Sequence, residues 1–308
     1  EMEGFSAAEN PEQHFKPVAY TGNSETTRTI DVGFPADLIW IKDRVHGNPH
    51  NLFDSVRGFG GASAGNNLQA DSAGQQNQFG TYGYISSITP TEIEVTSGDT
   101  NASYVNKDGD DMIAWCWKAC GSGANFMKDG VEDTSISSGA TLQVDKMSVN
   151  TKAGFSIVQY QGDNGSVGGA VPHGLGKRPD FIFIKTMDVS GNWLVWSSAI
   201  EDCGYLHLDL SNMEAGDSSY WHSTGMNSQT VGVEKGVSNL SGSHIMYCWC
   251  SVPGYSAFGK YTGGNAGNFI YTGFKPAFVM FKKVNVEKES WVIADNARDP
   301  DNPTQKFL

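Results

Sequence analysis

The stretch that decides the fold is GFPADLIWIK at residues 33–42, because the chain repeats its pattern twice. The later copies read GLGKRPDFIFIK at residues 174–185 and GFKPAFVMFK at residues 273–282. Each copy carries a glycine, a proline and then a short run of aromatic and aliphatic residues, and each follows a tyrosine, at Tyr20, Tyr160 and Tyr261. Self-similarity of this kind indicates an architecture of repeated units.

A second shared motif fixes the register of the copies. The sequence IAWCW at residues 113–117 matches IMYCW at residues 245–249. We therefore expect a lead-in at 1–14, module 1 at 15–120, a Gly/Ser-rich linker at 121–153, module 2 at 154–258 and an incomplete module 3 at 259–308. Half a module would leave strand edges unpaired, so we expect a longer natural chain or another chain to complete it.

The local signals within each module are those of β-strands. Short apolar runs follow a proline, turn pairs such as Asn-Gly separate them, and no long window has helical spacing of apolar residues. The predicted fold class is all-β, with tandem β-sandwich modules of a jelly-roll or lectin-like kind. In module 3 we expect strands at Phe269–Thr272, Ala277–Lys282 and Trp291–Ala294, and in the linker a short strand at Thr141–Val144.

Positions that repeat between modules should be core positions. A side chain of this size gains roughly 1.5–3 kcal/mol on full burial. The predicted core residues are Leu38, Trp40, Trp117, Phe181, Phe183, Trp249, Phe278 and Met280.

The composition excludes several classes of protein. The chain has 308 residues with 34 acidic and 21 basic side chains, a net charge of −13. Nucleic-acid binding needs a basic surface, so we expect no nucleic-acid partner. No apolar run approaches the length of a membrane span and no signal peptide begins the sequence, so we expect no membrane insertion. The five cysteines lack disulfide or zinc spacing, and we expect them to be reduced.

The sequence offers no convincing catalytic set, cofactor fingerprint or metal site. The loop at residues 106–111 lacks the alternating acidic pattern of an EF-hand. Asp54 and Arg57 recur in module 3 as Asp295 and Arg298, whereas module 2 has a serine and an isoleucine there. We interpret both Asp–Arg pairs as structural ion pairs that hold a loop.

Aromatic residues in polar, Gly/Ser-rich surroundings are the remaining candidates for a binding role. Tyrosine and tryptophan stack well on sugar rings and also serve as interface anchors. The alternative is that they fold back over the sandwich edges. The candidate ligand-binding residues are Tyr82, Tyr84, Tyr104, Tyr220 and Trp221.

The set of repeated motifs resembles a module of structural proteins of tailed bacteriophages, particularly marine ones. The motifs are YTGN at residues 20–23, GFPADLIWIK at 33–42, DSVRG at 54–58 and AWCWKA at 114–119, and the resemblance covers roughly residues 15–308. It implies a non-enzymatic virion surface protein of tail-fibre or adhesion type, assembled in the host cytoplasm. Its expected partners are other virion proteins, further copies of itself and host-surface carbohydrate.

Two other functions remain open from the sequence. One is a capsid decoration protein, which would bind a protein lattice. The other is a carbohydrate-active enzyme, which needs two carboxylates about 5–10 Å apart across a cleft.

Overall fold

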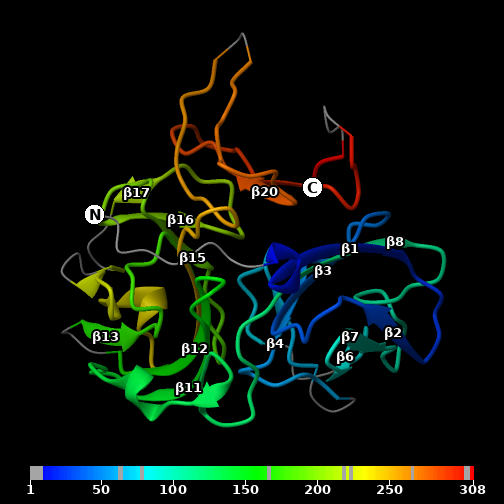
Figure 1. The fold of residues 1–308 in the computed structure, drawn as a ribbon, viewed down its shortest axis with the longest axis horizontal. Coiled ribbons are helices and arrows are strands. Elements are labelled where there is room, and N and C mark those ends of the chain that lie inside the picture. Colours follow the sequence, from blue (N-terminus) through cyan, green and yellow to red (C-terminus); the bar gives the residue numbers. More distant parts are fainter. Residues whose placement is uncertain are drawn as a thin grey trace.

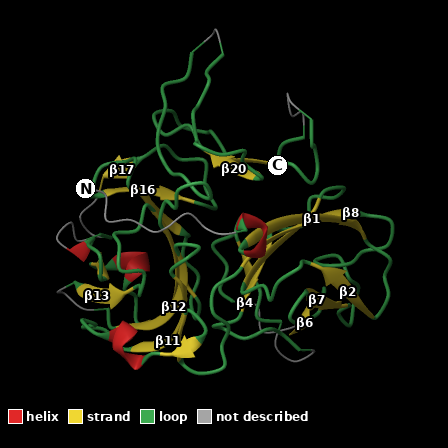
Figure 2. Ribbon diagram, viewed as in Figure 1, coloured by secondary structure: helices red, strands yellow, loops and turns green. Residues whose placement is uncertain are grey.

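The alternation of short apolar runs with glycine-rich turns produces a nearly all-β chain, which confirms the predicted fold class. In the computed structural model 38% of the residues are in strands and 4% in helices. It describes residues 10–61, 65–76, 80–164, 168–216, 220–221, 225–264, 267–301 and 306–308. Figures 1 and 2 show two large curved sheets side by side, with a small hairpin above them.

Module 1 is a sandwich of two antiparallel sheets. The larger sheet has the order β1 (Phe15–Thr21), β8 (Asp111–Trp117), β3 (Leu38–Asp43), β4 (Asn51–Asp54) and β5 (Leu68–Gln69). The smaller one has the order β2 (Thr27–Asp31), β7 (Glu92–Thr96) and β6 (Tyr84–Ile88). A buried core that includes Ile39, Ile41, Phe53 and Val95 fills the space between them. Since side chains alternate along a strand, Ile39 and Ile41 face this core while Leu38 and Trp40 face the opposite side.

A larger, nine-stranded sheet contains the strands expected in module 2 together with three strands that precede it in the chain. The order is β10 (Val131–Glu132), β9 (Phe126–Lys128), β11 (Val144–Asn150), β12 (Phe155–Gly162), β19 (Gly242–Trp249), β14 (Phe181–Thr186), β15 (Leu194–Ser197), β16 (Gly204–His207) and β17 (Ala215–Gly216). A pair, β13 (Gly169–Pro172) and β18 (Thr230–Val233), covers one face.

The predicted linker at 121–153 does not behave as a linker. Three strands, β9, β10 and β11, form within it and continue the sheet of module 2 through the pairing of β11 with β12. The expected short strand at Thr141–Val144 is also wrong, since β11 begins at Val144. Met147 and Val149 bury their side chains in the core of module 2, and this burial outweighs the local Ser/Gly composition.

Helix is limited to single 3₁₀ turns in the described chain. They are η1 (Pro11–Gln13), η2 (Thr134–Ser137) and η4 (Gly236–Ser238). Among the described residues, no helix has the length and apolarity needed to cross a membrane.

The strand register matches at the positions where the sequence repeats. Leu38 of β3 lies opposite Trp117 of β8 and Asp54 of β4. Phe181 of β14 lies opposite Trp249 of β19 and Ser197 of β15. In the hairpin of β20 (Phe278–Phe281) and β21 (Val292–Asp295), Phe278 lies opposite Asp295. The modules defined above thus place equivalent residues in equivalent pairs, and their boundaries stay a prediction.

The expected strands of module 3 form only in part. Strand β20 lies within the segment expected at 277–282, and β21 overlaps the segment expected at 291–294 and extends one residue beyond it. The expected strand at Phe269–Thr272 is absent, and Phe269 is 93% exposed. The equivalent strands β2 and β13 pair with β7 and β18, and no described strand takes that place beside residues 269–272.

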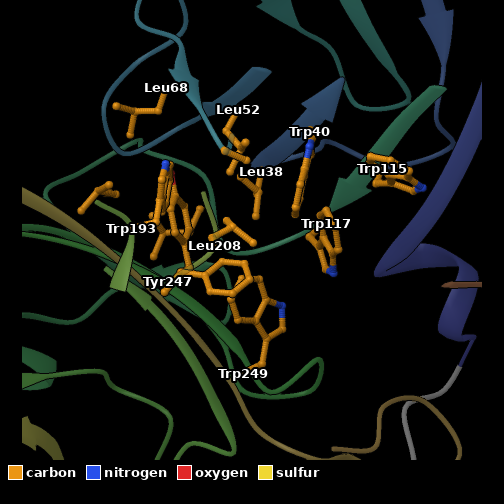
Figure 3. Packing of buried hydrophobic residues seen from close by; sticks show 14 of the residues in the cluster. Leu38, Trp40, Leu52, Leu68, Trp115, Trp117, Trp193, Leu208, Tyr247 and Trp249 are labelled. Atoms are coloured by element: carbon orange, nitrogen blue, oxygen red, sulfur yellow. The ribbon is translucent and has the colours of Figure 1, made fainter. Parts of the chain in front are cut away.

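A third core lies between the modules and not inside any of them. The side chains on the outer faces of both large sheets, with Ile293 of β21, form one buried cluster (Figure 3). The rings of Trp117 and Trp249 lie 6.3 Å apart in it, and Phe278 packs 5.7 Å from Trp117. Five of the eight predicted core residues are buried, and Phe181, Phe278 and Met280 are partly buried against the cluster.

Candidate functional site

A groove of about 420 Å³ opens at one end of the module 1 sandwich. The loop that follows β3 forms one side of it, and turns on either side of the β6–β7 hairpin form the other. Its lining consists of aromatic, amide, hydroxyl and basic side chains: His46, Asn48, Pro49, Tyr82, Asn101, Ser103, Tyr104 and Lys107.

Two of the predicted binding residues meet in this groove. The rings of Tyr82 and Tyr104 lie 4.9 Å apart at an angle of 49°, and the backbone N–H of Tyr104 donates to the carbonyl of Tyr82. Tyr82 is 37% exposed, while the hydroxyl of Tyr104 accepts a hydrogen bond of 3.1 Å from Gln69 Nε2. Burial, and next the adjacent Tyr82, raise the pKa of Tyr104, so its hydroxyl is neutral at physiological pH. The pair therefore lines the groove with one exposed ring, Tyr82, that packs on a second ring, Tyr104, held by Gln69.

Asp43, the last residue of β3, organises the polar side of the groove. Its buried carboxylate accepts hydrogen bonds from the backbone N–H groups of Val45 (2.8 Å) and His46 (3.2 Å) and from the amide of Asn48. Burial alone would raise its pKa, but these three donors outweigh burial and lower it. Asp43 is therefore a carboxylate that shapes the loop and holds Asn48 in the lining.

His46 of the groove lining lies close to two carboxylates. His46 Nδ1 lies 2.8 Å from Asp110 Oδ2 and 3.4 Å from Asp43 Oδ2, and one ligand atom from each residue fits within 4.8 Å. Nitrogen and oxygen donors of this kind suit a divalent cation. However, the ammonium of Lys107 lies 3.1 Å from His46 Nδ1 and 3.4 Å from Asp110 Oδ2. The lysine thus already supplies a positive charge to these groups, and a metal would have to displace it.

The other three predicted binding residues do not share this groove. Trp221 is fully buried in the core of module 2, so its prediction as a ligand-binding residue is wrong. Its neighbours in the sequence are polar, but its side chain packs against apolar residues that are distant in the sequence. Tyr220 is partly buried against the same core and packs edge-on against Tyr205 at 4.7 Å. Tyr84 packs against the core of module 1. Tyr220 and Tyr84 thus pack over the two cores, as the alternative interpretation expected.

Both Asp–Arg pairs are present as buried ion pairs. Arg57 Nε donates to Asp54 Oδ2 at 2.5 Å, and Arg298 Nε donates to Asp295 Oδ2 at 2.6 Å. Both arginines also donate to backbone carbonyls of the preceding strand. Their side chains are 0–1% exposed, which suits a structural role and leaves them unavailable to a ligand.

A second repeated carboxylate, at Asp37 and Asp180, was not among the predicted site residues. Asp37 accepts from the hydroxyl of Ser55 (2.6 Å) and the N–H of Ala119 (2.7 Å). Asp180 accepts likewise from Ser198 (2.9 Å) and from the N–H of Ser251 (2.7 Å). The signal was visible in the sequence, because an Asp precedes the repeated apolar run in modules 1 and 2.

Comparison with known proteins identifies a family. Residues 10–308 match the family described as "Domain of unknown function (DUF7483)", and the chain belongs to it. The match spans all three modules. Neither a curated protein nor a solved structure matches the chain.

Proposed function

We propose that this protein is a non-enzymatic adhesion protein that binds carbohydrate in the Tyr82–Tyr104 groove. The observation that carries the proposal is the tyrosine pair itself, in which Tyr82 is exposed to the groove and Tyr104 is held by a hydrogen bond from Gln69. Aromatic faces pack against the C–H face of a sugar ring, while amides and hydroxyls satisfy its hydroxyl groups. Asn48, Asn101 and Ser103 supply such polar groups beside the pair.

The chemistry of the lining favours binding over hydrolysis. Glycoside hydrolysis usually needs two carboxylates that face the substrate. Among the described residues, those that line the groove include no carboxylate, and the nearby Asp43 and Asp110 are engaged with Asn48, His46 and Lys107. This supports a receptor-binding role more than a carbohydrate-active enzyme.

The resemblance of the repeated motifs to phage structural modules suggests where such binding would act. A virion surface protein of tail-fibre type would use the groove to hold host-surface glycans, and a capsid decoration protein is the alternative. Immunogold labelling of particles that carry the protein distinguishes the two, because the label would lie on fibres in the first case and on the capsid shell in the second.

Glycan-array screening followed by calorimetry tests the binding proposal. We expect a carbohydrate ligand whose affinity falls about tenfold in Tyr82→Ala, since the loss of one ring contact of roughly 1.4 kcal/mol lowers the affinity by a factor of ten. Tyr271→Ala, at an exposed tyrosine of module 3, is the matched control and should leave the affinity unchanged. Binding that survives Tyr82→Ala and Tyr104→Ala together would refute the groove as the site.

A further inference from the structure

A cluster of three side chains that can bind a metal lies at one end of module 1 and has no counterpart in module 2. It consists of Asp43, His46 and Asp110. The register of β3 with β8 matches that of β14 with β19, and the loops after β3 and β14 are equally long, at residues 44–50 and 187–193. The same positions of module 2 hold Thr186, Val189 and Gly242. This arrangement of strands therefore forms without the three ligating groups.

The three side chains have the spacing of a tetrahedral zinc site. Zinc lies about 2.1 Å from a histidine nitrogen or a carboxylate oxygen, so two donors of a tetrahedron lie about 3.4 Å apart. His46 Nδ1 lies 3.4 Å from Asp43 Oδ2 and 2.8 Å from Asp110 Oδ2. The second distance has to lengthen by about 0.6 Å to match. The imidazole can make this shift because the side chain of His46 is 48% exposed.

The carboxylate of Asp110 is buried but does not hold the backbone. Its side chain is 8% exposed, and in the part of the chain that the structure describes its partners are the side chains of His46 and Lys107. Asp43, by contrast, accepts from the backbone N–H groups of two loop residues. A buried carboxylate needs compensating charge or hydrogen bonds, and Asp110 finds them only within the cluster.

Lys107 fills the cluster as a cation that can leave. Its ammonium lies 3.1 Å from His46 Nδ1 and 3.4 Å from Asp110 Oδ2, and its side chain is 37% exposed. Two carboxylates and one ammonium leave one negative charge uncompensated. A divalent ion in place of the ammonium compensates both carboxylates, and the flexible lysine side chain can carry its charge into water.

We propose that Asp43, His46 and Asp110 bind one zinc ion, with Lys107 displaced into solvent. Three protein ligands of this kind leave one position of the tetrahedron for water or another ligand. The imidazole favours zinc over calcium and magnesium, which prefer oxygen ligands alone. Asn48, which donates to Asp43 Oδ2, would orient that ligating carboxylate. The ion would lie at the wall of the groove, since His46 and Lys107 both line it.

Isothermal titration calorimetry with zinc chloride tests the proposal on the full 308-residue chain. The chain is first treated with a chelator and dialysed. Cys120 and Cys203, the cysteines that are not buried, are replaced by serine in every sample so that their thiolates do not bind zinc. We expect saturable binding of one zinc ion per chain, and much weaker binding of calcium and magnesium. No carbohydrate is present, so this result and the proposed glycan binding fail independently.

Three variants locate the ion. His46→Ala removes a ligand at an exposed position and should weaken zinc binding by at least about tenfold. Lys107→Met removes the competing charge and should strengthen binding by about threefold, which a purely structural lysine would not do. His14→Ala, at a histidine outside the cluster, is the control and should leave the affinity unchanged. No zinc binding, equal affinity of the two histidine variants, or a Lys107→Met variant that binds no more tightly than the parent chain would overturn the proposal.

Discussion

The contact between Tyr247 and Asp54 gives the sharpest prediction about how the modules hold together. Tyr247 is fully buried, and its hydroxyl donates to a carboxylate that also accepts from Arg57. Burial, and next the nearby Asp54 carboxylate, raise the pKa of Tyr247 far above its usual value, so the hydroxyl remains a donor at any ordinary pH. Tyr247→Phe removes this one hydrogen bond and preserves the shape of the ring.

A hydrogen bond to a charged group contributes about 1.5–3 kcal/mol, and the buried partner here makes about 2 kcal/mol the expected loss in free energy of unfolding. Urea denaturation followed by tryptophan fluorescence measures it. Tyr84→Phe is the control, because that tyrosine lies partly exposed on module 1 and should change stability by less than about 0.5 kcal/mol. A loss below about 0.5 kcal/mol in Tyr247→Phe would refute the idea that this contact joins the two modules.

Three other changes have defined outcomes. Trp115→Phe should speed hydrogen exchange in residues 292–295 without affecting β12, because it removes the donor to Asp295; unchanged exchange there would count against the link between modules 1 and 3. The pKa values of His50, His173 and His244 are lowered by burial to about 3, 4 and 4, so these groups are neutral when folded but protonate near pH 6.5 when unfolded. The urea midpoint should therefore fall as the pH drops from about 6.5 toward 4, and a flat profile would contradict their burial. Burial lowers the pKa of Lys185 to about 8. Between pH 8 and about 10.5 the unfolded chain therefore carries a proton on this lysine that the folded chain lacks. Within this window the free energy of unfolding should rise with pH by more in the wild type than in Lys185→Met.

The repeated motifs predicted the strand register well because each places large apolar side chains at fixed offsets from a turn. Leu38, Phe181 and Phe278 indeed share one pairing position. The sequence could not show that the outer faces of the sheets join in one core, because alternation along a strand shows which residues share a face but not what that face contacts. Strand β11 was missed for a similar reason, since Met147 and Val149 are stabilised by distant residues of module 2.

The candidate site was accessible to sequence reasoning only in part. Tyr82 and Tyr104 stood out as aromatic residues in a polar context. His46 and Asp110 did not, because they are 64 residues apart and meet only through the pairing of β3 with β8. Trp221 shows the opposite error, in which a polar local context concealed complete burial.

Saturation-transfer NMR with a carbohydrate ligand found by array screening tests the central functional claim most directly. We expect strong saturation of the sugar ring protons that pack on Tyr82 and Tyr104, with the effect lost in the Tyr82→Ala/Tyr104→Ala double variant. Undiminished saturation in that variant would contradict the claim that this groove is where the protein binds carbohydrate.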